Sequence, residues 1–506
     1  MVSSSEKYYL GIDIGTHESK GVLIDRFCHV VSFASTKHGL DNPRPGWFEH
    51  DAEGVWWADF CRLSKELLKQ SRIPPQAISC VGASGLGCDC VPVDVNCTPL
   101  HKAILYGIDS RATEEVNELN ALWGNADGEI PSPLCSSSIA PKILWFKHHC
   151  PEIHASTYKF LTASSYLTAK LTGQFCMDKY LATSWSPLYK LKGMDINETL
   201  CSVCCHPHQL PRLSHATDIV GCVTSLAAQE TGLAEGTPVL TGTGDSGAEA
   251  ISAGVFQPGD IMVQIGSTCF LIYYADRMLS DPRIWPGPFI IPGSLCITAG
   301  TNTAGTLTQW YRDNLFPELL AAEQSGGENA FSAMASKIEN IPAGSDGLIT
   351  LPYFSGERTP INDPYAKGIV FGLQISHTRY HMYKSALEGI GYSIAQHFSI
   401  LEENHMPVKK IVLTGGGTKN AQWTQIIADI LGREVFLPKV TIGAAYGDAL
   451  MAALADGSVT DWAAMDRIVE RGQKICPDAK SHQIYFTNFP IFNQLYQSTK
   501  GLMHLI

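Results

Sequence analysis

The sequence lacks a hydrophobic run long enough to cross a membrane, and it has no excess of positive charge. None of its apolar stretches approaches the ~20 residues of a membrane span. The first residues, MVSSSEKYYLGIDIG, lack the regions of a secretory signal. The net charge of −12 disfavours nucleic acid and anionic membranes as main partners. We therefore expect a cytoplasmic protein that binds neither nucleic acid nor membrane.

The cysteines lack the spacing of a disulfide scaffold. There are 16 in a chain of 506 residues, irregularly placed, whereas disulfide scaffolds are short chains dense in paired cysteines. One cluster offers metal ligands, namely Cys201, Cys204, Cys205, His206 and His208. A distant second C-x2-C pair is missing and Pro207 interrupts the cluster. We expect core and loop thiols there, with zinc as the alternative.

Two common nucleotide-binding signatures are also missing. The chain has no G-x-x-x-x-G-K-[ST] loop and no H-R-D or D-F-G set, so P-loop and protein-kinase architectures are excluded. Gly242, Gly244 and Gly247 do spell G-x-G-x-x-G, but in mid-chain and with Asp245 inside the turn. A dinucleotide site needs an acidic residue about 20 positions later, where this chain has Ile261–Gly266. An NAD-dependent dehydrogenase therefore remains only a minor alternative.

The stretch that contains these glycines is the most informative one in the chain. Pro238–Ala250, PVLTGTGDSGAEA, has a short apolar run, a glycine-rich turn and an alanine-rich helix start. A carboxylate held at such a strand-to-helix turn can act as a general base toward a hydroxyl group. We expect this role for Asp245. The alternative is a tight glycine turn with a solvated aspartate.

Two stretches far apart in the sequence share one pattern. Ile12–Asp25 and Val263–Asp276 each contain an apolar strand, then Ile-Gly-Thr or Ile-Gly-Ser, then a second strand that ends at aspartate. Backbone N–H groups and the hydroxyls of Thr16, Ser267 and Thr268 can cradle phosphate oxygens in such turns. The repeat predicts two halves of similar topology that bind phosphate, and two ordinary hairpins are the alternative.

The remaining patterns indicate an α/β protein with two domains, which we place at residues 1–253 and 254–506. Apolar periodicity predicts helices over Asp51–Gln70, Tyr158–Gly173 and Tyr380–Asn404. A small-residue helix is expected over Gly443–Asp456. No low-complexity linker separates the halves, so we expect them to pack closely with a cleft.

Taken together, these motifs resemble the FGGY carbohydrate kinases, within the larger group of two-domain ATPases that includes actin, hexokinase and the heat-shock ATPases. Gly368–Glu388 fits the second signature of the family position by position, whereas Ser137–His148 fits the first signature more loosely, with Ile139 at a position where Pro, Ser or Thr is usual. Leu351–Pro360, LPYFSGERTP, looks most like the xylulose kinases. The resemblance extends from Tyr9 to at least Asp456.

The resemblance implies two actin-like, ribonuclease-H-like ATPase domains with an interdomain cleft. The first domain would bind sugar and carry the base, and the second would bind ATP. The implied reaction is ATP-dependent phosphorylation of a small sugar, most simply D-xylulose or a related pentulose, with Mg²⁺. A kinase for a polyol or a sugar acid and a non-catalytic actin-like nucleotide-binding switch are the alternatives. Sugar and ATP are the expected partners, and a homodimer is left open.

The family's functional positions carry over residue by residue. Asp245 matches the catalytic base, and Asp13 resembles the aspartate that positions Mg²⁺ through water. The expected ATP-binding residues are Asp13, Gly15, Thr16, Lys20, Gly266, Ser267, Thr268, Gly305, Gly415, Gly416 and Asn420. The expected substrate-binding residues are Gly87, Cys88, Asp89, Asp109, Arg111 and Asp245.

Two departures from the xylulose kinases concern the sugar. Where these enzymes usually have G-Q-M-H-G, this chain has Gly85–Asp89, GLGCD, which replaces Met-His by Gly-Cys and adds a carboxylate. Where they have W-N-D-x-R, this chain keeps Asp109 and Arg111 but loses Trp and Asn. Arg111 and Asp89 also have a purely structural interpretation. Arg111 can form an ion pair near the helix that follows it. Asp89 can be a solvated turn residue.

Overall fold

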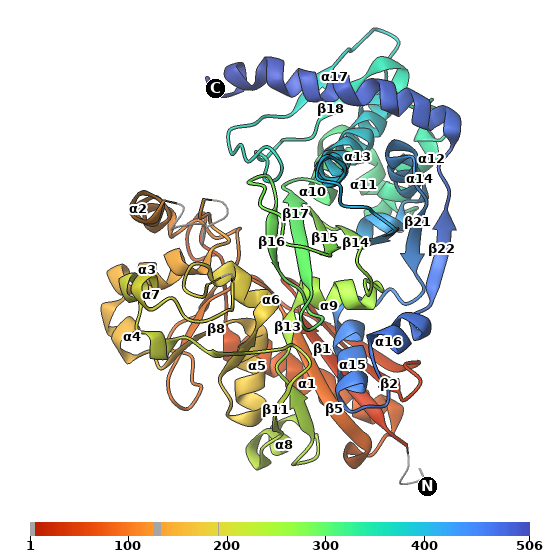
Figure 1. Cartoon of the computed structure of the whole chain (residues 1–506). Coiled ribbons are helices and arrows are strands. Elements are labelled where there is room, and N and C mark those ends of the chain that lie inside the picture. The colour runs from red at the N-terminus through yellow and green to blue at the C-terminus, as the bar shows by residue number, and fades with distance from the viewer. Residues whose placement is uncertain (1–5, 125–132, 191) are drawn as a thin grey trace. The chain divides into compact units, whose positions relative to one another are not determined.

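The chain folds into two compact units, which are drawn in Figure 1. The computed structural model describes residues 6–124, 133–190 and 192–506. Unit 1 consists of Met1–Phe256, Pro286–Cys296 and Ile442–Glu470, and unit 2 of Gln257–Trp285, Ile297–Thr441 and Arg471–Ile506. These units differ from two consecutive halves, because two later segments return to unit 1. Helix α15 (Ala444–Ala455) in the second of these segments packs against β1 and β5 of unit 1.

The central sheet of unit 1 has the strand order β11-β12-β5-β1-β2-β3. Strand β5 runs parallel to β1, whereas β2 and β3 continue antiparallel from it. Strands β1 and β5 are almost wholly buried, as expected for strands covered on both faces. The bounds of these strands, with β13 beside β5, are β1 (Tyr8–Ile14), β2 (Glu18–Asp25), β3 (Val30–Lys37), β5 (Ile78–Gly85), β11 (Ile219–Cys222), β12 (Pro238–Leu240) and β13 (Thr243–Gly244).

Helices cover this sheet and form a peripheral layer. The helices are α1 (Ala58–Ser71), α2 (Thr113–Trp123), α3 (Ile139–His149), α4 (Pro151–Ser156), α5 (Ala163–Thr172), α6 (Lys179–Ala182), α7 (Glu198–Cys204), α8 (Ser225–Thr231), α9 (Asp245–Ser252) and α16 (Trp462–Ile468). Short strand pairs complete the unit: β4 (Glu49–His50) with β7 (Ala103–Ile104), β6 (Val91–Val93) with β8 (Lys159–Leu161), and β9 (Cys176–Asp178) with β10 (Arg212–Ser214).

Small residues let α15 approach its neighbours closely. A Cβ atom on Gly11 of β1 would lie 2.0 Å from the carbonyl oxygen of Ala445. A Cβ atom on Gly447 would lie 1.9 Å from the carbonyl oxygen of Ala248 in α9. Because larger side chains would overpack these contacts, the small-residue composition of the segment is explained by the packing of α15 on β1 and α9.

The sheet of unit 2 has the order β17-β15-β14-β20-β21-β22, and β14 pairs with β20 in parallel. Its strands are β14 (Asp260–Ile265), β15 (Cys269–Ala275), β17 (Leu295–Thr301), β20 (Lys410–Thr414), β21 (Val435–Pro438) and β22 (Arg471–Ile475). Strand β16 (Trp285–Pro288) precedes β17, and β18 (Ile349–Leu351) pairs with β19 (Ile369–Phe371). The helices are α10 (Gly305–Leu315), α11 (Pro317–Gln324), α12 (Ala330–Ile338), α13 (Arg379–Glu403), α14 (Ala421–Leu431) and α17 (Ala479–Met503).

The structure confirms the repeat of topology. Each of the two similar stretches forms a hairpin, β1–β2 and β14–β15, and the first strand of each hairpin pairs in parallel with a later strand. The long helix predicted near residue 380 is α13.

Two helix predictions are wrong in part. A π-helical turn (Ala52–Trp57) precedes α1, and Tyr158–Gly173 contains strand β8 before α5, because Phe160 and Leu161 are buried in pairing with β6. No helix among the described residues is both long and apolar enough to span a bilayer.

Candidate active site

Asp245 is the first residue of α9 and follows the glycine turn directly. Gly244 is the N-cap of this helix, and the Asp245 Oδ1 accepts the backbone N–H of Ser246 at 2.6 Å. A helix N-terminus favours a carboxylate, but burial dominates here. Burial raises the pKa of Asp245 to about 7, with a further contribution from the negative charge of Asp13. A carboxyl group poised near neutral pH suits a general base.

Asp13 lies near the end of β1 and is linked to α15 through Ser84 of β5. The Ser84 Oγ is 3.0 Å from the Asp13 Oδ1 and 2.6 Å from the Asp448 Oδ2. Burial raises the pKa of Asp13 to about 6, although Ser84 and Lys20 oppose the shift. Burial also raises the pKa of Asp448 well above its ordinary value. Sequence reasoning missed Asp448, which is fully buried in a helix of otherwise small or apolar residues.

The predicted sugar-binding turn after β5 has an unusual backbone. Cys88 adopts a positive φ of 65°, which is strained for a residue with a side chain and is typical of functional sites. A Cβ atom on Gly87 would meet only the Leu181 Cδ2, at 3.4 Å. The Asp89 Oδ2 accepts the N–H of Ala163, but its Oδ1 is buried without a hydrogen-bond partner. Buried polar atoms are normally paired, so this oxygen is an exception, and contact of Asp89 with sugar stays a prediction.

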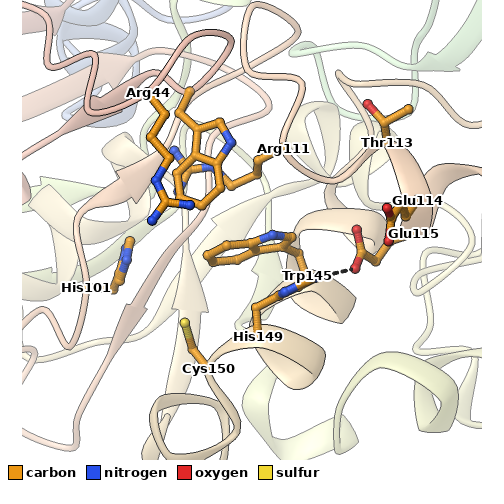
Figure 2. A pocket seen from close by; sticks show the side chains of 10 residues that line it. Arg44, His101, Arg111, Thr113, Glu114, Glu115, Trp145, His149 and Cys150 are labelled. Carbon is orange, nitrogen blue, oxygen red and sulfur yellow. Dashed lines mark hydrogen bonds and ion pairs between the residues drawn. The ribbon is translucent and has the colours of Figure 1, made fainter.

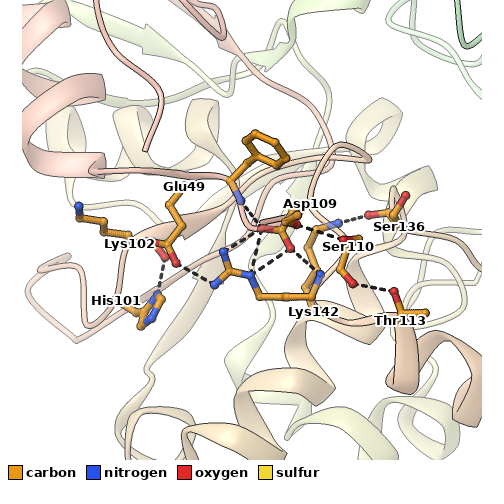
Figure 3. Close-up of polar contacts among 11 residues, drawn as sticks. Glu49, His101, Lys102, Asp109, Ser110, Thr113, Ser136 and Lys142 are labelled. Atoms are coloured by element: carbon orange, nitrogen blue, oxygen red, sulfur yellow. Dashed lines mark hydrogen bonds and ion pairs between the residues drawn. The ribbon is translucent and has the colours of Figure 1, made fainter. Parts of the chain in front are cut away.

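Asp109 and Arg111, in contrast, bind each other. Figure 3 shows the polar contacts around Asp109. The Arg111 guanidinium donates to Asp109 at 2.8 Å and to Glu49 at 2.8 Å, and its side chain is wholly buried. Asp109 also accepts the backbone N–H of Phe48 at 2.6 Å. These contacts support the alternative that Arg111 is an ion-pair partner within the fold. Contact of either residue with sugar stays a prediction.

Arg111 also lines a cavity of about 610 Å³ in unit 1, shown in Figure 2. Its guanidinium carbon lies 4.2 Å from the Trp47 ring centroid and 5.2 Å from that of Trp145, and His149 stacks on Trp145. Glu115 accepts from His149 at 3.1 Å. The lining residues are Arg44, Trp47, His101, Arg111, Thr113, Glu114, Glu115, Trp145, His149 and Cys150. None of the residues expected to bind ATP is among them.

The turn between β1 and β2 carries Gly15 and Thr16. The Gly15 N–H donates to the Glu18 carbonyl at 3.2 Å and closes the turn. The Thr16 Oγ1 lies 3.1 Å from the hydroxyl of Tyr106. Lys20 is opposite Asp13 in the β1–β2 register, and its positive charge lowers the pKa of Asp13.

The corresponding turn of unit 2 brings Gly266, Ser267 and Gly305 together. The Gly305 N–H, at the start of α10, donates to the Gly266 carbonyl at 2.9 Å. The N–H groups of Ala304 and Thr306 both donate to the Ser267 carbonyl at 3.0 Å. A Cβ atom on Gly266 would meet only the Thr268 carbonyl oxygen, at 3.6 Å, so the turn is open on its other side.

The predicted adenosine motif follows β20. Gly415 has a φ of 85°, and a Cβ atom there would lie 2.6 Å from the Ile265 carbonyl oxygen, so this glycine is required by the fold. A Cβ atom on Gly416 would meet nothing within 4 Å. The side chain of Asn420 caps α14 by accepting the N–H of Trp423. The backbone at Gly416 is therefore open, and its contact with a nucleotide stays a prediction.

Sequence reasoning also missed Tyr180, the second residue of α6. Its hydroxyl lies 3.0 Å from the Ser246 Oγ, next to Asp245. Asp178 caps α6, accepts from the Thr243 Oγ1 at 2.9 Å, and has a pKa raised to about 7 by burial. No local pattern marks these residues, because they lie more than 60 positions before the turn that they contact.

The zinc alternative gains no support from the cysteine cluster. The Cys201 and Cys205 sulfurs lie 3.6 Å apart and both residues are buried. Among the residues that the structure describes, none form a group of three or more His, Cys, Asp or Glu suited to hold a metal. Cys201, Cys204 and Cys205 are all buried thiols, as expected for core positions.

Asp13 fits the magnesium that the family resemblance implies. Mg²⁺ prefers oxygen ligands and is usually held by one or two carboxylates with water and substrate phosphates. Asp13 offers a half-buried carboxylate whose pKa is raised by its partly desolvated position, and a nearby divalent cation would stabilise its charged form.

Two family models match the chain. The N-terminal domain of the FGGY family of carbohydrate kinases matches residues 8–252, and the C-terminal domain of that family matches residues 261–455. Among curated proteins, the chain is 28% identical to xylulose kinase of Escherichia coli (strain K12) over 500 residues, 98% of this chain and 100% of the relative. It is 26% identical to gluconokinase of Bacillus subtilis (strain 168) over 493 residues, 96% of this chain and 95% of the relative.

A solved structure agrees in fold. The crystal structure of xylulose kinase from Rhodospirillum rubrum matches with a TM-score of 0.88 and 27% identity, covering 98% of this chain and 100% of the other. The two-domain α/β architecture of this chain is thus the one that such kinases have.

Proposed function

Since the chain belongs to the FGGY family of carbohydrate kinases, we propose that it phosphorylates a hydroxyl of a small neutral ketose, with Asp245 as the general base. ATP-dependent sugar phosphorylation is the reaction of this family, and it replaces the dinucleotide alternative for the glycine turn. The observation that carries the proposal is the half-buried Asp245 at the N-terminus of α9, directly after the glycine turn, with a pKa raised to about 7.

The chemistry needs a base and precise positioning more than a covalent intermediate. Asp245 would accept the proton of the attacking sugar hydroxyl as that oxygen gains nucleophilic character. The unpartnered Oδ1 of Asp89 would pair with another sugar hydroxyl. In unit 2, the turn at Gly266 and Ser267 would bind phosphate and the open backbone at Gly416 would bind the nucleoside.

Mg²⁺ would neutralise charge on the transferring phosphate. Asp13 would hold it through water, while Ser84 orients the Asp13 carboxylate by hydrogen bonding to its Oδ1. The hydroxyl of Thr16 and the backbone of Gly15 would bind phosphate oxygens in the same turn.

A neutral ketose fits unit 1 better than a sugar acid does. Burial raises the pKa of Asp13, Asp89 and Asp245 in this region, so the surroundings disfavour further negative charge. Relatives named xylulose kinase support a pentulose such as D-xylulose. A relative named gluconokinase supports a sugar acid as the second candidate.

A substrate panel separates these candidates. We expect kcat/KM for D-xylulose or D-ribulose to exceed that for xylitol and D-gluconate by at least about tenfold, the effect of one unmatched polar contact. A preference for D-gluconate would replace the ketose proposal by the sugar-acid one. ATP binding without turnover on any sugar would instead support a nucleotide-binding switch.

A further inference from the structure

Two buried histidines contact the carbonyl groups of the turn between β1 and β2. The His38 Nε2 lies 3.0 Å from the Gly15 carbonyl oxygen, and the His50 Nε2 lies 3.1 Å from that of Thr16. The backbone N–H of His38 donates to the next carbonyl, that of His17, at 3.0 Å. Three consecutive carbonyls of the turn are therefore held by residues that lie outside it.

The hydrogen bonds of His50 define its proton state. The Trp56 indole N–H donates to the His50 Nδ1 at 3.0 Å, so this nitrogen is an acceptor. The Nε2 must then carry the proton that is donated to Thr16, and the ring is neutral. Burial, with the nearby charge of His38, lowers the pKa of His50 to about 4 and agrees with the neutral form.

The hydrogen bonds of His38 require the opposite state. Its Nδ1 lies 2.8 Å from the Asp59 Oδ2 and its Nε2 faces the Gly15 carbonyl, so both nitrogens face acceptors and both carry protons. His38 is thus an imidazolium paired with Asp59, and both side chains are only 6% exposed. Burial lowers the pKa of His38, but Asp59 and the carbonyls of Gly15 and Thr16 outweigh it and the net pKa is raised.

The surrounding groups favour this charge distribution. Ser19 of β2 donates to the same Asp59 oxygen at 2.8 Å and its Oγ is 3.4 Å from the His38 Nδ1. The ring of His50 from β4 meets the His38 ring edge-on at 5.1 Å. With His50 neutral, Asp59 of α1 is the charged partner of the His38 ring.

We propose that His38 and His50 are positioning residues for phosphate, which hold the turn so that its N–H groups face the ligand. In a trans peptide the C=O and the following N–H point in opposite directions. Because the carbonyls of Gly15, Thr16 and His17 point to the histidines, the N–H groups of Thr16, His17 and Glu18 point away from them. Successive N–H groups on one side form an anion site. The inference rests on the proposed phosphate role of Gly15 and Thr16.

In unit 2 the carbonyl groups of the corresponding turn are held by backbone N–H groups. There the carbonyls of Gly266 and Ser267 accept N–H groups from residues 304–306 at the start of α10. In unit 1 the first two carbonyls of the turn are held by side chains instead, one charged and one neutral. The orientation of this turn therefore depends on individual side chains that mutation can remove.

Three variants and a control test the proposal. With MgATP as the varied substrate, His38→Gln and His50→Leu should each raise KM about tenfold, the loss of one strong hydrogen bond, with KM for sugar within twofold. His50→Gln should remain near wild type, because a carboxamide can accept from Trp56 and donate to Thr16. The control is His29→Gln, since His29 is 73% exposed and pairs with Asp25 on the same sheet.

Binding and pH measurements separate positioning from folding. His38→Gln should weaken calorimetric binding of AMP-PNP with Mg²⁺ about tenfold and leave adenosine binding unchanged. Because the pKa of His38 is raised, kcat/KM for MgATP should fall on the alkaline side of its pH profile, where His38 loses its proton. Asp59→Asn removes one nearby negative charge and should move this fall to lower pH by about one unit. Unchanged AMP-PNP binding in His38→Gln, or an unmoved fall in Asp59→Asn, would overturn the inference. A wild-type protein that binds no AMP-PNP would overturn the proposed function instead.

Discussion

The hydroxyl of Ser84 lies 2.6 Å from the carboxyl group of Asp448, and the same oxygen is 3.0 Å from Asp13. A hydroxyl can donate only one hydrogen bond, so one of the two carboxyl groups must be protonated and donate to Ser84. Burial raises the pKa of Asp448 well above its ordinary value and that of Asp13 only to about 6. Asp448 is therefore the protonated partner, and Ser84 donates to an ionised Asp13.

This arrangement predicts different effects for two substitutions of Asp448. Asp448→Asn keeps a neutral donor for Ser84, so its free energy of unfolding should lie within about 1 kcal/mol of wild type. Asp448→Ala removes the donor from a buried site and should cost about 1–3 kcal/mol. Urea unfolding at pH 8 measures both. Equal losses in the two variants would contradict a protonated Asp448.

Asp245 should reduce stability at neutral and alkaline pH. Its pKa in the folded protein is about 7, above the ordinary 3.8, so the folded state keeps a proton that the unfolded state loses between these values. The free energy of unfolding therefore falls as pH rises through this window. Asp245→Asn cannot ionise, so it should be more stable than wild type at pH 8, by as much as about 4 kcal/mol.

At pH 4 the Asp245→Asn variant should gain no comparable free energy of unfolding over wild type, because Asp245 of the folded wild type is protonated at that pH. Urea unfolding at both pH values tests this difference, with the exposed Asp195→Asn as the control. A stability difference between Asp245→Asn and wild type that does not change with pH would contradict a raised pKa at Asp245.

Two adjacent glycines should separate folding from nucleotide binding. Gly416→Val places its side chain in open space, so stability should be unchanged while KM for MgATP rises at least about tenfold through a clash with the nucleotide. Gly415→Ala introduces a strained φ and a contact of 2.6 Å with Ile265, so it should cost about 1–3 kcal/mol of stability. Thermal unfolding and ATP titration of both variants would show whether the effects divide in this way.

Arg111 should act on stability more than on sugar affinity. Arg111→Met leaves Asp109 and Glu49 without their buried cationic partner, so the free energy of unfolding should fall by about 3–5 kcal/mol. KM for sugar should stay within about threefold in the folded fraction, less than one hydrogen bond contributes. A large rise in KM without loss of stability would instead place Arg111 in the sugar site.

Local patterns were sufficient to predict the elements that define the fold. The turns at Gly15 and Gly266 and the position of Asp245 at the start of α9 follow from glycine and hydroxyl spacing within a few residues. The helix α13 follows from apolar periodicity. Each of these predictions depends on side chains that are near in sequence, where propensity and pattern are informative.

The features that the sequence did not predict depend on packing between residues far apart in the chain. The return of α15 to unit 1 depends on Gly11 and Gly447, whose small size matters only once β1 and α9 lie against the helix. Tyr180, His38 and Asp448 contact the site from distant parts of the chain. The pairing of Arg111 with Glu49 could not be deduced from the W-N-D-x-R comparison, because Glu49 lies on β4, 62 positions away.

The most direct test of the account is the rate of ADP release from MgATP with and without D-xylulose, measured for wild type and Asp245→Asn. The account predicts sugar-dependent turnover in wild type and a kcat about 10²–10⁴-fold lower in the variant, the usual contribution of a general base. The KM values for sugar and MgATP should change little. A variant that keeps more than about a tenth of the wild-type kcat, well above the range for loss of a general base, would remove Asp245 from that role.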